Sequence, residues 1–331
     1  MKKTKRILAV VMALVLICSV FASCSGNTDN DGEKTTDGAK DKYTIGICQL
    51  VEHEALDAAT QGFMDAVKKG LGEENVEFNV QNAQGDAPTC ATISNQFVSD
   101  KVDLILANAT PALQAAAAAT GDIPILGTSI TEYGVALNIK DFNGTVGGNV
   151  SGTSDLAPLD EQAAMLKEWF PEAKTVALLY CSAEANSQYQ VDVMTKELKA
   201  LGIEAKAYPF ADSNDLSPVC TNAAENADVI YVPTDNTVAS NTGIIYNICS
   251  VAKKPVVAGE AGICNGCGVA TLSISYYDLG YTTGEMAVKI LKGEADIADM
   301  AIEYAPASKK YNEKICNELG ITPVEGYEAL A

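Results

Sequence analysis

The chain has 331 residues and a mass of 34.7 kDa; 47% of the residues are hydrophobic and 20% are charged. This length predicts two domains of ordinary size, and the apolar fraction excludes a generally disordered chain. A formal net charge of −20 argues against nucleic acid as a partner, because the phosphate backbone is negative too. The single histidine, His53, excludes metal sites built from several histidines and most histidine-dependent catalytic triads.

The amino-terminal residues have the pattern of a secretory signal peptide. The cationic opening MKKTKR is followed by the apolar run ILAVVMALVLICSVFA and then by Ser23 and Cys24. The tetrapeptide FASC resembles a bacterial lipobox, so we expect residues 1–23 to be removed and Cys24 to carry a lipid such as palmitate. Cleavage by an ordinary signal peptidase, which would release the protein, is the alternative. Residues 24–42 are polar and are expected to form a flexible tether.

From Tyr43 onward, short apolar runs alternate with segments of helical periodicity. The first series predicts strands at 43–50, 76–80, 102–107 and 123–126, and helices at 55–71, 89–99 and 111–119. After the glycine-rich stretch 143–153, the second series predicts helices at 159–170, 187–201, 216–226 and 239–251, and strands at 175–180, 203–208, 229–232 and 255–258. An apolar segment at 268–273 and helices at 278–293 and 311–319 complete the chain.

This regular alternation of strands and helices is typical of α/β proteins. Each series implies a doubly wound parallel sheet that is covered by helices on both faces. Two similar modules, joined by the glycine-rich stretch, predict a protein of two lobes with a ligand cleft between them.

Residues that follow the predicted strands are candidates for a binding site, because ligands of open parallel sheets bind beyond the carboxyl ends of the strands. These residues are 49–53, 108–110, 128–129, 181–187, 233–236 and 259–260, and they are rich in Ser, Thr and Asn. Hydroxyls and helix amides suit a ligand carboxylate, whereas Asp235 or Glu260 would suit an ammonium. The set predicts an amphoteric ligand such as an amino acid; helix capping is the alternative role for Thr110, Asn186 and His53.

Other motifs do not indicate catalysis or a cofactor. The glycines at 144–152 form neither a phosphate-binding GxxxxGK[ST] loop nor a strand-linked GxGxxG, and SGTS at 151–154 is not a GxSxG motif. Cys264 and Cys267 form a lone CxxC pair, which favours a disulfide or two inert thiols over a metal or redox centre. We therefore expect no catalytic residue, no bound metal and no cofactor.

Sequence stretches along the whole body carry a family resemblance. They are IGICQLVEHEALDAATQGF (45–63), NAQGD (82–86), LILANATPALQAA (104–116), IPILGTSITEYGVAL (123–137), NVSGTSDLAPLDEQ (149–162), VALLYCSAEANSQYQ (176–190), VIYVPTDNTVASN (229–241), ISYYDLGYTTGEMAVKILKG (274–293) and YNEKICNELGITP (311–323). Together they resemble ABC-transporter substrate-binding lipoproteins of the tryptophan/tyrosine uptake type. Glu54 departs from the resemblance, since proline is expected there.

The resemblance implies a type I periplasmic-binding-protein fold with a three-segment hinge. Lobe 1 would comprise 43–150 plus 274–304, and lobe 2 would comprise 151–273 plus 305–331. The ligand contacts that it implies are Glu52, His53, Thr110, Ser129, Ser151, Thr153, Asn186, Ser187, Thr234, Asp235, Asn236, Glu260 and Asp278. Tyr133, Tyr189 and Tyr276 are alternatives for a contact to an aromatic ligand side chain.

The function implied by the resemblance is solute capture outside the cell. A monomer, anchored through Cys24 on the outer face of the cell membrane, would bind Trp, Tyr or Phe by lobe closure. It would then deliver the amino acid to an ABC permease and its ATPase subunit. Alternatives are a receptor for another amino acid, a sugar or a nucleoside, a ligand sensor, and a surface thiol-redox enzyme that uses Cys264 and Cys267.

Overall fold

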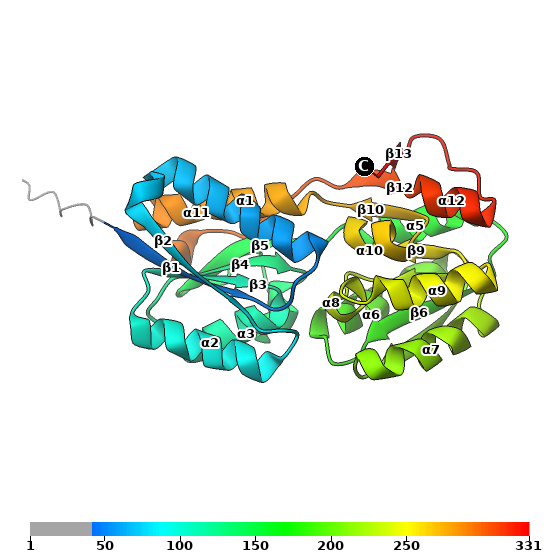
Figure 1. Ribbon diagram of the computed structural model, residues 1–331, viewed down its shortest axis with the longest axis horizontal. Helices are drawn as coiled ribbons and strands as arrows, with labels where there is room; N and C mark the ends of the chain where they lie inside the picture. Colours follow the sequence, from blue (N-terminus) through cyan, green and yellow to red (C-terminus); the bar gives the residue numbers. More distant parts are fainter. Residues whose placement is uncertain (1–41, 331) are drawn as a thin grey trace, which may run out of the picture. The chain divides into compact units, whose positions relative to one another are not determined.

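The structure, a computed structural model, describes residues 42–330, so the predicted signal peptide, the lipid site at Cys24 and nearly all of the tether lie outside it. Strands and helices alternate from the first described residues (Figure 1). The elements of the first part are β1 (Tyr43–Gln49), α1 (Glu54–Leu71), β2 (Val76–Asn82), α2 (Ala87–Asp100), β3 (Leu104–Asn108), α3 (Thr110–Ala119), β4 (Ile125–Ile130), α4 (Tyr133–Leu137) and β5 (Val150–Ser154).

The first sheet has six strands in the order β11-β5-β4-β3-β1-β2, and all neighbouring strands are parallel. β3 and β4 are buried along their whole length, because helices cover both faces of the sheet. Their carboxyl ends, together with those of β1 and β5, lie at one edge of the sheet, where the following loops and helices begin.

A second sheet is built by the next series of elements. These are α5 (Leu159–Trp169), β6 (Thr175–Cys181), α6 (Ala185–Ala200), β7 (Glu204–Phe210), α7 (Ser213–Asn226), β8 (Val229–Val232), α8 (Asn236–Ala239), α9 (Thr242–Ala252), β9 (Val256–Ala258), α10 (Ala261–Cys267) and β10 (Ala270–Ser273). The strand order is β13-β12-β10-β9-β8-β6-β7, and β10 and β12 form the antiparallel pair in an otherwise parallel sheet. We call each sheet with its covering helices a lobe.

The chain then returns to the first lobe and leaves it again. α11 (Tyr276–Leu291) packs along α1 (Figure 1), and β11 (Glu303–Tyr304) pairs with β5. β12 (Ser308–Tyr311), α12 (Glu313–Leu319) and β13 (Glu328–Ala329) complete the second lobe. Three segments, 155–158, 274–275 and 305–307, therefore connect the lobes. The predicted α/β class with two parallel-sheet lobes and a three-segment connection is confirmed.

Helices α1 and α11 approach each other closely. A methyl group added at Gly280 of α11 would lie 1.9 Å from the carbonyl oxygen of Ala59 in α1, so a side chain cannot be accommodated without moving a helix. This contact ties the second turn of α1 to the second turn of α11, and the first residues of both helices face the region between the lobes.

Strand β5 was not predicted, because its residues VSGTS lack an apolar run. All five residues are nevertheless buried, and the strand pairs with β4. Gly152 allows the close approach, since its φ is +144° and a Cβ there would lie 2.0 Å from the carbonyl oxygen of Gly127. The first sheet therefore continues to Ser154, beyond the expected lobe boundary at 150; the division of the chain into lobes otherwise stays a prediction.

Three short helices, α4, α8 and α10, also differ from the expected elements. α4 and α10 lie in segments for which no element was predicted, and the helix expected at 239–251 is divided into α8 and α9. The division follows Asp235, whose side chain caps the short α8 by accepting the backbone N–H of Val238. None of the helices between residues 42 and 330 is both long enough and apolar enough to cross a lipid bilayer.

Candidate functional site

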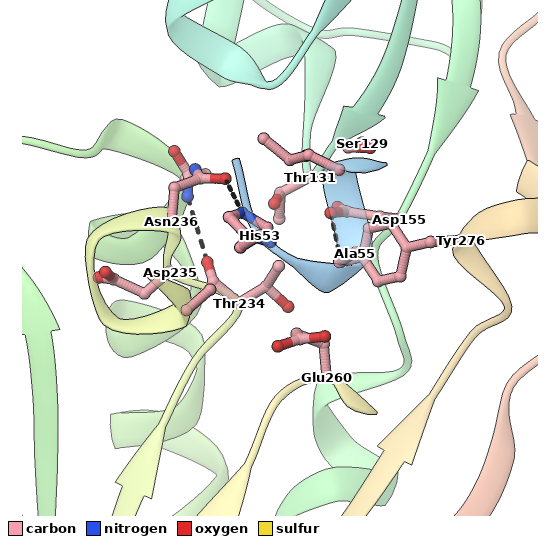
Figure 2. A pocket seen from close by; sticks show the side chains of 13 residues that line it. His53, Ala55, Ser129, Thr131, Asp155, Thr234, Asp235, Asn236, Glu260 and Tyr276 are labelled. Atoms are coloured by element: carbon pink, nitrogen blue, oxygen red, sulfur yellow. Dashed lines mark hydrogen bonds between the residues drawn. The ribbon is translucent and has the colours of Figure 1, made fainter. Parts of the chain in front are cut away.

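A cavity of about 10 Å³ lies where the carboxyl ends of strands from the two sheets face each other (Figure 2). This volume is about that of one water-sized site and lies far below the roughly 300 to 1,000 Å³ of small-molecule sites, so the lining residues lie close together. The lining residues are His53, Ala55, Leu56, Ser129, Thr131, Asp155, Asn186, Thr234, Asp235, Asn236, Ala239, Glu260 and Tyr276. They belong to the described part of the chain and include acids and hydroxyls but neither Lys nor Arg.

Three buried polar atoms in this pocket make no hydrogen bond to any described residue. They are Ser129 Oγ, Asp155 Oδ1 and Asn186 Oδ1. The orientation of Asn186 is set by its amide nitrogen, which donates to the carbonyl oxygen of Thr234 (3.2 Å), so that Oδ1 is left over. Unsatisfied buried polar groups are rare and destabilising, which indicates that this pocket is built to receive hydrogen-bonding groups of a ligand.

Asp155 is the acid with an available oxygen. It directly follows β5 and is 4% exposed, and its Oδ2 accepts the hydroxyl of Tyr276 at 2.9 Å. Burial raises the pKa of Asp155 to about 6, and the Tyr276 hydrogen bond opposes this rise because it favours the ionised form. At neutral pH the site therefore presents a carboxylate whose second oxygen can accept further hydrogen bonds.

The two acids predicted to bind an ammonium, Asp235 and Glu260, use their oxygens differently. Glu260 caps α10: one oxygen accepts the Gly262 N–H at 2.6 Å and the other accepts the Ile263 N–H. Asp235 accepts the Val238 N–H at 2.9 Å and the Cys181 N–H at 2.7 Å. Burial raises the pKa of Glu260 to about 7, and burial together with the Glu184 carboxylate raises that of Asp235. Both acids hold backbone groups in place, which leaves Asp155 better suited to a ligand ammonium.

His53 connects the lobes across the pocket. Its Nε2 lies 3.3 Å from Oδ1 of Asn236, and the figure shows this contact as a dashed line (Figure 2). Asn236 is held in turn by Glu184, which accepts its backbone N–H (3.0 Å) and its side-chain amide (2.7 Å). Burial lowers the pKa of His53, so the imidazole is neutral at physiological pH.

The amino-terminal turn of α1 faces the same pocket. His53 is the N-cap residue but makes no side-chain capping bond with the described residues, and Ala55 and Leu56 line the pocket. The first N–H groups of a helix have no partner within the helix, and the helix dipole makes them an anion site. This turn of an 18-residue helix can hold a ligand carboxylate without a basic side chain.

Seven of the predicted contacts line the pocket: His53, Ser129, Asn186, Thr234, Asp235, Asn236 and Glu260. The other six do not line it: Glu52, Thr110, Ser151, Thr153, Ser187 and Asp278. The acids among these six are exposed, and the hydroxyls of two of them bond within the first lobe. Ser151 Oγ donates to the carbonyl of Met300 at 3.0 Å, and Thr153 Oγ1 lies 2.8 Å from Thr283 Oγ1. Ligand contact by these six stays a prediction.

Two polar residues of the pocket, Thr131 and Asp155, are not indicated by the sequence pattern. The sequence also does not distinguish Tyr276 from the two other tyrosines that were predicted as alternative contacts. Those two tyrosines lie elsewhere: the Tyr133 hydroxyl is buried and donates to the Gly127 carbonyl, and Tyr189 is half-buried outside the lining. Asp155 follows a strand in the same way as the predicted residues do. The rule of strand ends would have included it if β5 had been identified.

The thiols in the described residues are all buried and free of disulfides. Cys264 and Cys267 lie in α10, where burial raises both pKa values and Cys267 donates to the Ile263 carbonyl at 3.3 Å. A thiol that is protonated and shielded from solvent is a poor nucleophile. Within residues 42–330, no group of three or more His, Cys, Asp or Glu side chains is arranged to hold a metal ion.

Comparison with known proteins identifies relatives over almost the whole described chain. Residues 44–331 match the family described as ABC transporter substrate binding protein. A protein of Clostridioides difficile (strain R20291) named tyrosine-binding protein is 39% identical over 300 residues, which cover 89% of this chain and 86% of that protein.

Two solved structures of relatives differ in their state. An ABC domain from Streptococcus pneumonia in complex with L-Trp is 33% identical, covers 87% of this chain and 100% of its own, and superposes with a TM-score of 0.83. The ligand-free, open structure of a substrate-binding protein from Clostridium difficile is 40% identical, covers 87% and 99%, and has a TM-score of 0.67. The backbone thus resembles the L-Trp complex more, although the open relative is nearer in sequence.

The protein has the same architecture as these relatives, with two lobes and three connecting segments. This architecture is the type I periplasmic-binding fold. From the match over residues 44–331 and the relative of 39% identity, the chain belongs to the ABC transporter substrate-binding protein family.

Proposed function

We propose that this protein captures an aromatic amino acid, tyrosine or tryptophan, between its lobes and delivers it unchanged to an ABC permease and its ATPase subunit. The observation that carries the proposal is the pocket between the two sheets, in which Asp155, Asn186 and Ser129 present buried polar atoms without partners among the described residues. The names of the relatives, a tyrosine-binding protein and an L-Trp complex, agree with this ligand class.

The chemistry of the unpaired atoms supports an amino-acid ligand. Asp155 Oδ1 and Asn186 Oδ1 are acceptors, and an ammonium offers three donors to satisfy them. Ser129 Oγ can donate to a carboxylate, which the first turn of α1 can also hold. An α-amino acid supplies both groups on the same carbon atom, whereas a sugar supplies neither charge.

The chemistry of the remaining lining also suits an aromatic side chain. The lining includes the ring of Tyr276, the neutral imidazole of His53 and the side chain of Leu56, none of which is charged. Offset or edge-on contacts between aromatic rings stabilise complexes by about 0.5 to 1.5 kcal/mol beyond the area that they bury.

Closure of the lobes around the ligand is supported by the contacts between them and by the resemblance to the L-Trp complex. Proteins of this family are extracytoplasmic. We further propose that the protein acts as a monomer held on the outer face of the membrane by lipid on Cys24, which lies outside the described residues. The buried thiols disfavour the alternative of a redox enzyme that uses Cys264 and Cys267.

Calorimetry with the mature protein tests the proposal directly. L-Tyrosine or L-tryptophan is expected to bind, and Asp155→Asn is expected to weaken binding at least tenfold, because a hydrogen bond to a charged group contributes about 1.5 to 3 kcal/mol. Asp65→Asn is the matched control, since Asp65 accepts a tyrosine hydroxyl, that of Tyr277 at 3.0 Å, on the outside of the first lobe. Binding of a sugar but of no amino acid would overturn the proposed ligand class.

A further inference from the structure

Asp155 stands at the start of one connection between the lobes, and Tyr276 directly follows the end of another. Asp155 directly follows β5, where the chain first leaves the first lobe, and Tyr276 is the first residue of α11, where the chain returns. The hydrogen bond from the Tyr276 hydroxyl to Asp155 Oδ2 (2.9 Å) joins the two connections, and Figure 2 shows the two side chains on the same wall of the pocket. Their exposures are only 6% and 4% for Tyr276 and Asp155, respectively.

This hydrogen bond determines which carboxylate oxygen of Asp155 is available to a ligand in the pocket. One carboxylate oxygen is engaged by Tyr276, and the other has no partner among the described residues. A buried carboxyl group tends to take up a proton, and two hydroxyls, first that of Tyr276 and then that of Thr131, oppose this tendency by lowering the pKa of Asp155. Burial raises the pKa of Tyr276 well above its usual range, so its hydroxyl keeps its proton and remains a donor.

Other titratable groups near Asp155 do not stabilise its charge. Tyr133 faces it from α4 and Glu260 faces it from the start of α10, and an acid at that position favours the protonated form. His53 lines the same pocket as a neutral imidazole. Because the lining contains neither Lys nor Arg, the hydroxyl of Tyr276 is the main side-chain donor that keeps the carboxylate ionised.

We propose that Tyr276 is a positioning residue for the ligand ammonium: its hydroxyl holds Asp155 ionised, with one oxygen turned toward the pocket. This inference rests on the proposed function and extends it, because it assigns the recognition of the ammonium to a pair of residues from two connections. Tyr276 thereby acts through Asp155, independently of any contact that its ring makes with the ligand.

The test is the pH dependence of affinity in the full-length protein carrying Tyr276→Phe. In the unchanged protein, the affinity for L-tyrosine is expected to fall as the pH drops through about 6, because protonation of Asp155 competes with the ammonium. Without the hydroxyl, the pH at which affinity falls is expected to rise by about one unit, and the affinity at pH 7 to fall about tenfold. Calorimetry between about pH 5 and pH 8.5 measures both quantities.

Tyr277→Phe is the matched control. Tyr277 is the next residue of the same helix, and its hydroxyl also donates to an aspartate, Asp65, but it is 41% exposed on the outer side. The control is expected to keep both the affinity and the pH profile of the unchanged protein. A loss in both variants would indicate a general effect on α11 and would overturn the role assigned to Tyr276.

Two further variants separate the possible failures. If Asp155→Asn binds L-tyrosine as tightly as the unchanged protein, the ammonium assignment in the proposed function is wrong and the role of Tyr276 falls with it. If Asp155→Asn loses affinity while Tyr276→Phe keeps the original pH profile, only the role of Tyr276 is overturned. Should Tyr276→Phe fail to fold, 3-fluorotyrosine placed at position 276 is the substitute: its more acidic hydroxyl should lower the pH at which affinity falls, and an unchanged profile overturns the inference.

Discussion

The three buried carboxylates of the pocket differ in what their oxygens contact. Both oxygens of Asp235 and of Glu260 accept backbone N–H groups, so these acids fix the starts of α8 and α10. Asp155 accepts the hydroxyl of Tyr276 on one side only. All three are carboxylates that follow a strand of a parallel sheet, and it is the number of local N–H groups within reach that separates a structural acid from a binding acid.

The raised pKa of Glu260 predicts how the stability of the ligand-free protein depends on pH. Its pKa is about 7 in the folded protein and about 4.5 for an unperturbed glutamate, so the folded state binds the proton more tightly and loses this advantage as the pH rises from 4.5 to 7. Glu260→Gln should therefore reduce the loss of unfolding free energy between about pH 5 and pH 8 by about 2 to 3 kcal/mol. Urea denaturation at the two pH values measures the unfolding free energies. If the unchanged protein and Glu260→Gln lose the same unfolding free energy between these pH values, the raised pKa of Glu260 is contradicted.

At the scale of elements, the pair α1 and α11 organises the first lobe's side of the pocket. α1 contributes its first turn and α11 contributes Tyr276, and the two helices touch at Gly280. Small shifts between these helices therefore move two walls of the pocket together.

Gly280→Ala tests this coupling. The added methyl would lie 1.9 Å from the Ala59 carbonyl oxygen, so overpacking should lower the unfolding free energy by about 1 to 3 kcal/mol and weaken amino-acid binding as well. Gly243→Ala, in α9 of the second lobe, is the control: nothing lies within 4 Å of its added methyl, and alanine favours the helix by up to about 1 kcal/mol. Thermal unfolding and calorimetry compare the two; a similar loss in both would refute the packing argument.

The elements also show what could be predicted from the sequence. Apolar runs such as VDLILA mark buried parallel strands, because both faces of the strand are covered, and the alternation with helices predicts the two sheets. β5 was not predicted because its burial depends on pairing with β4 and on the conformation of Gly152. Neither of these produces an apolar run in the sequence. The site was only partly predictable for a similar reason. The ends of predicted strands indicate which residues lie near the site, but which carboxylate oxygens already accept hydrogen bonds depends on three-dimensional contacts.

For the whole molecule, the contacts that join the lobes govern the balance between open and closed forms. One is the His53–Asn236 contact inside the pocket, and another is the donation from Asn265 Nδ2 in α10 to Glu54 Oε2 in α1, at 3.2 Å on the exposed side. Neither Asn265 nor Glu54 lines the pocket. A contact made only in the closed form raises ligand affinity without touching the ligand.

Asn265→Ala should therefore weaken L-tyrosine binding about two- to five-fold, which corresponds to about 0.5 to 1 kcal/mol for one exposed hydrogen bond. Asn226→Ala is the control, because the Asn226 side chain bonds to Asn222 within α7, away from the contacts between the lobes. Calorimetry gives both affinities. If Asn265→Ala binds as tightly as Asn226→Ala, the Asn265–Glu54 contact makes no contribution to closure.

Because the chain crosses three times between the lobes, the sheets can be completed only in a certain order. The outer strand of the first sheet, β11, pairs with β5 from the far half of the sequence, and the second sheet is completed by β12 and β13 near the end of the described chain. Pairings of such long sequence separation form late and slowly. During synthesis both sheets therefore lack their last strands until almost the whole chain has emerged, so each lobe is completed only at the end of synthesis.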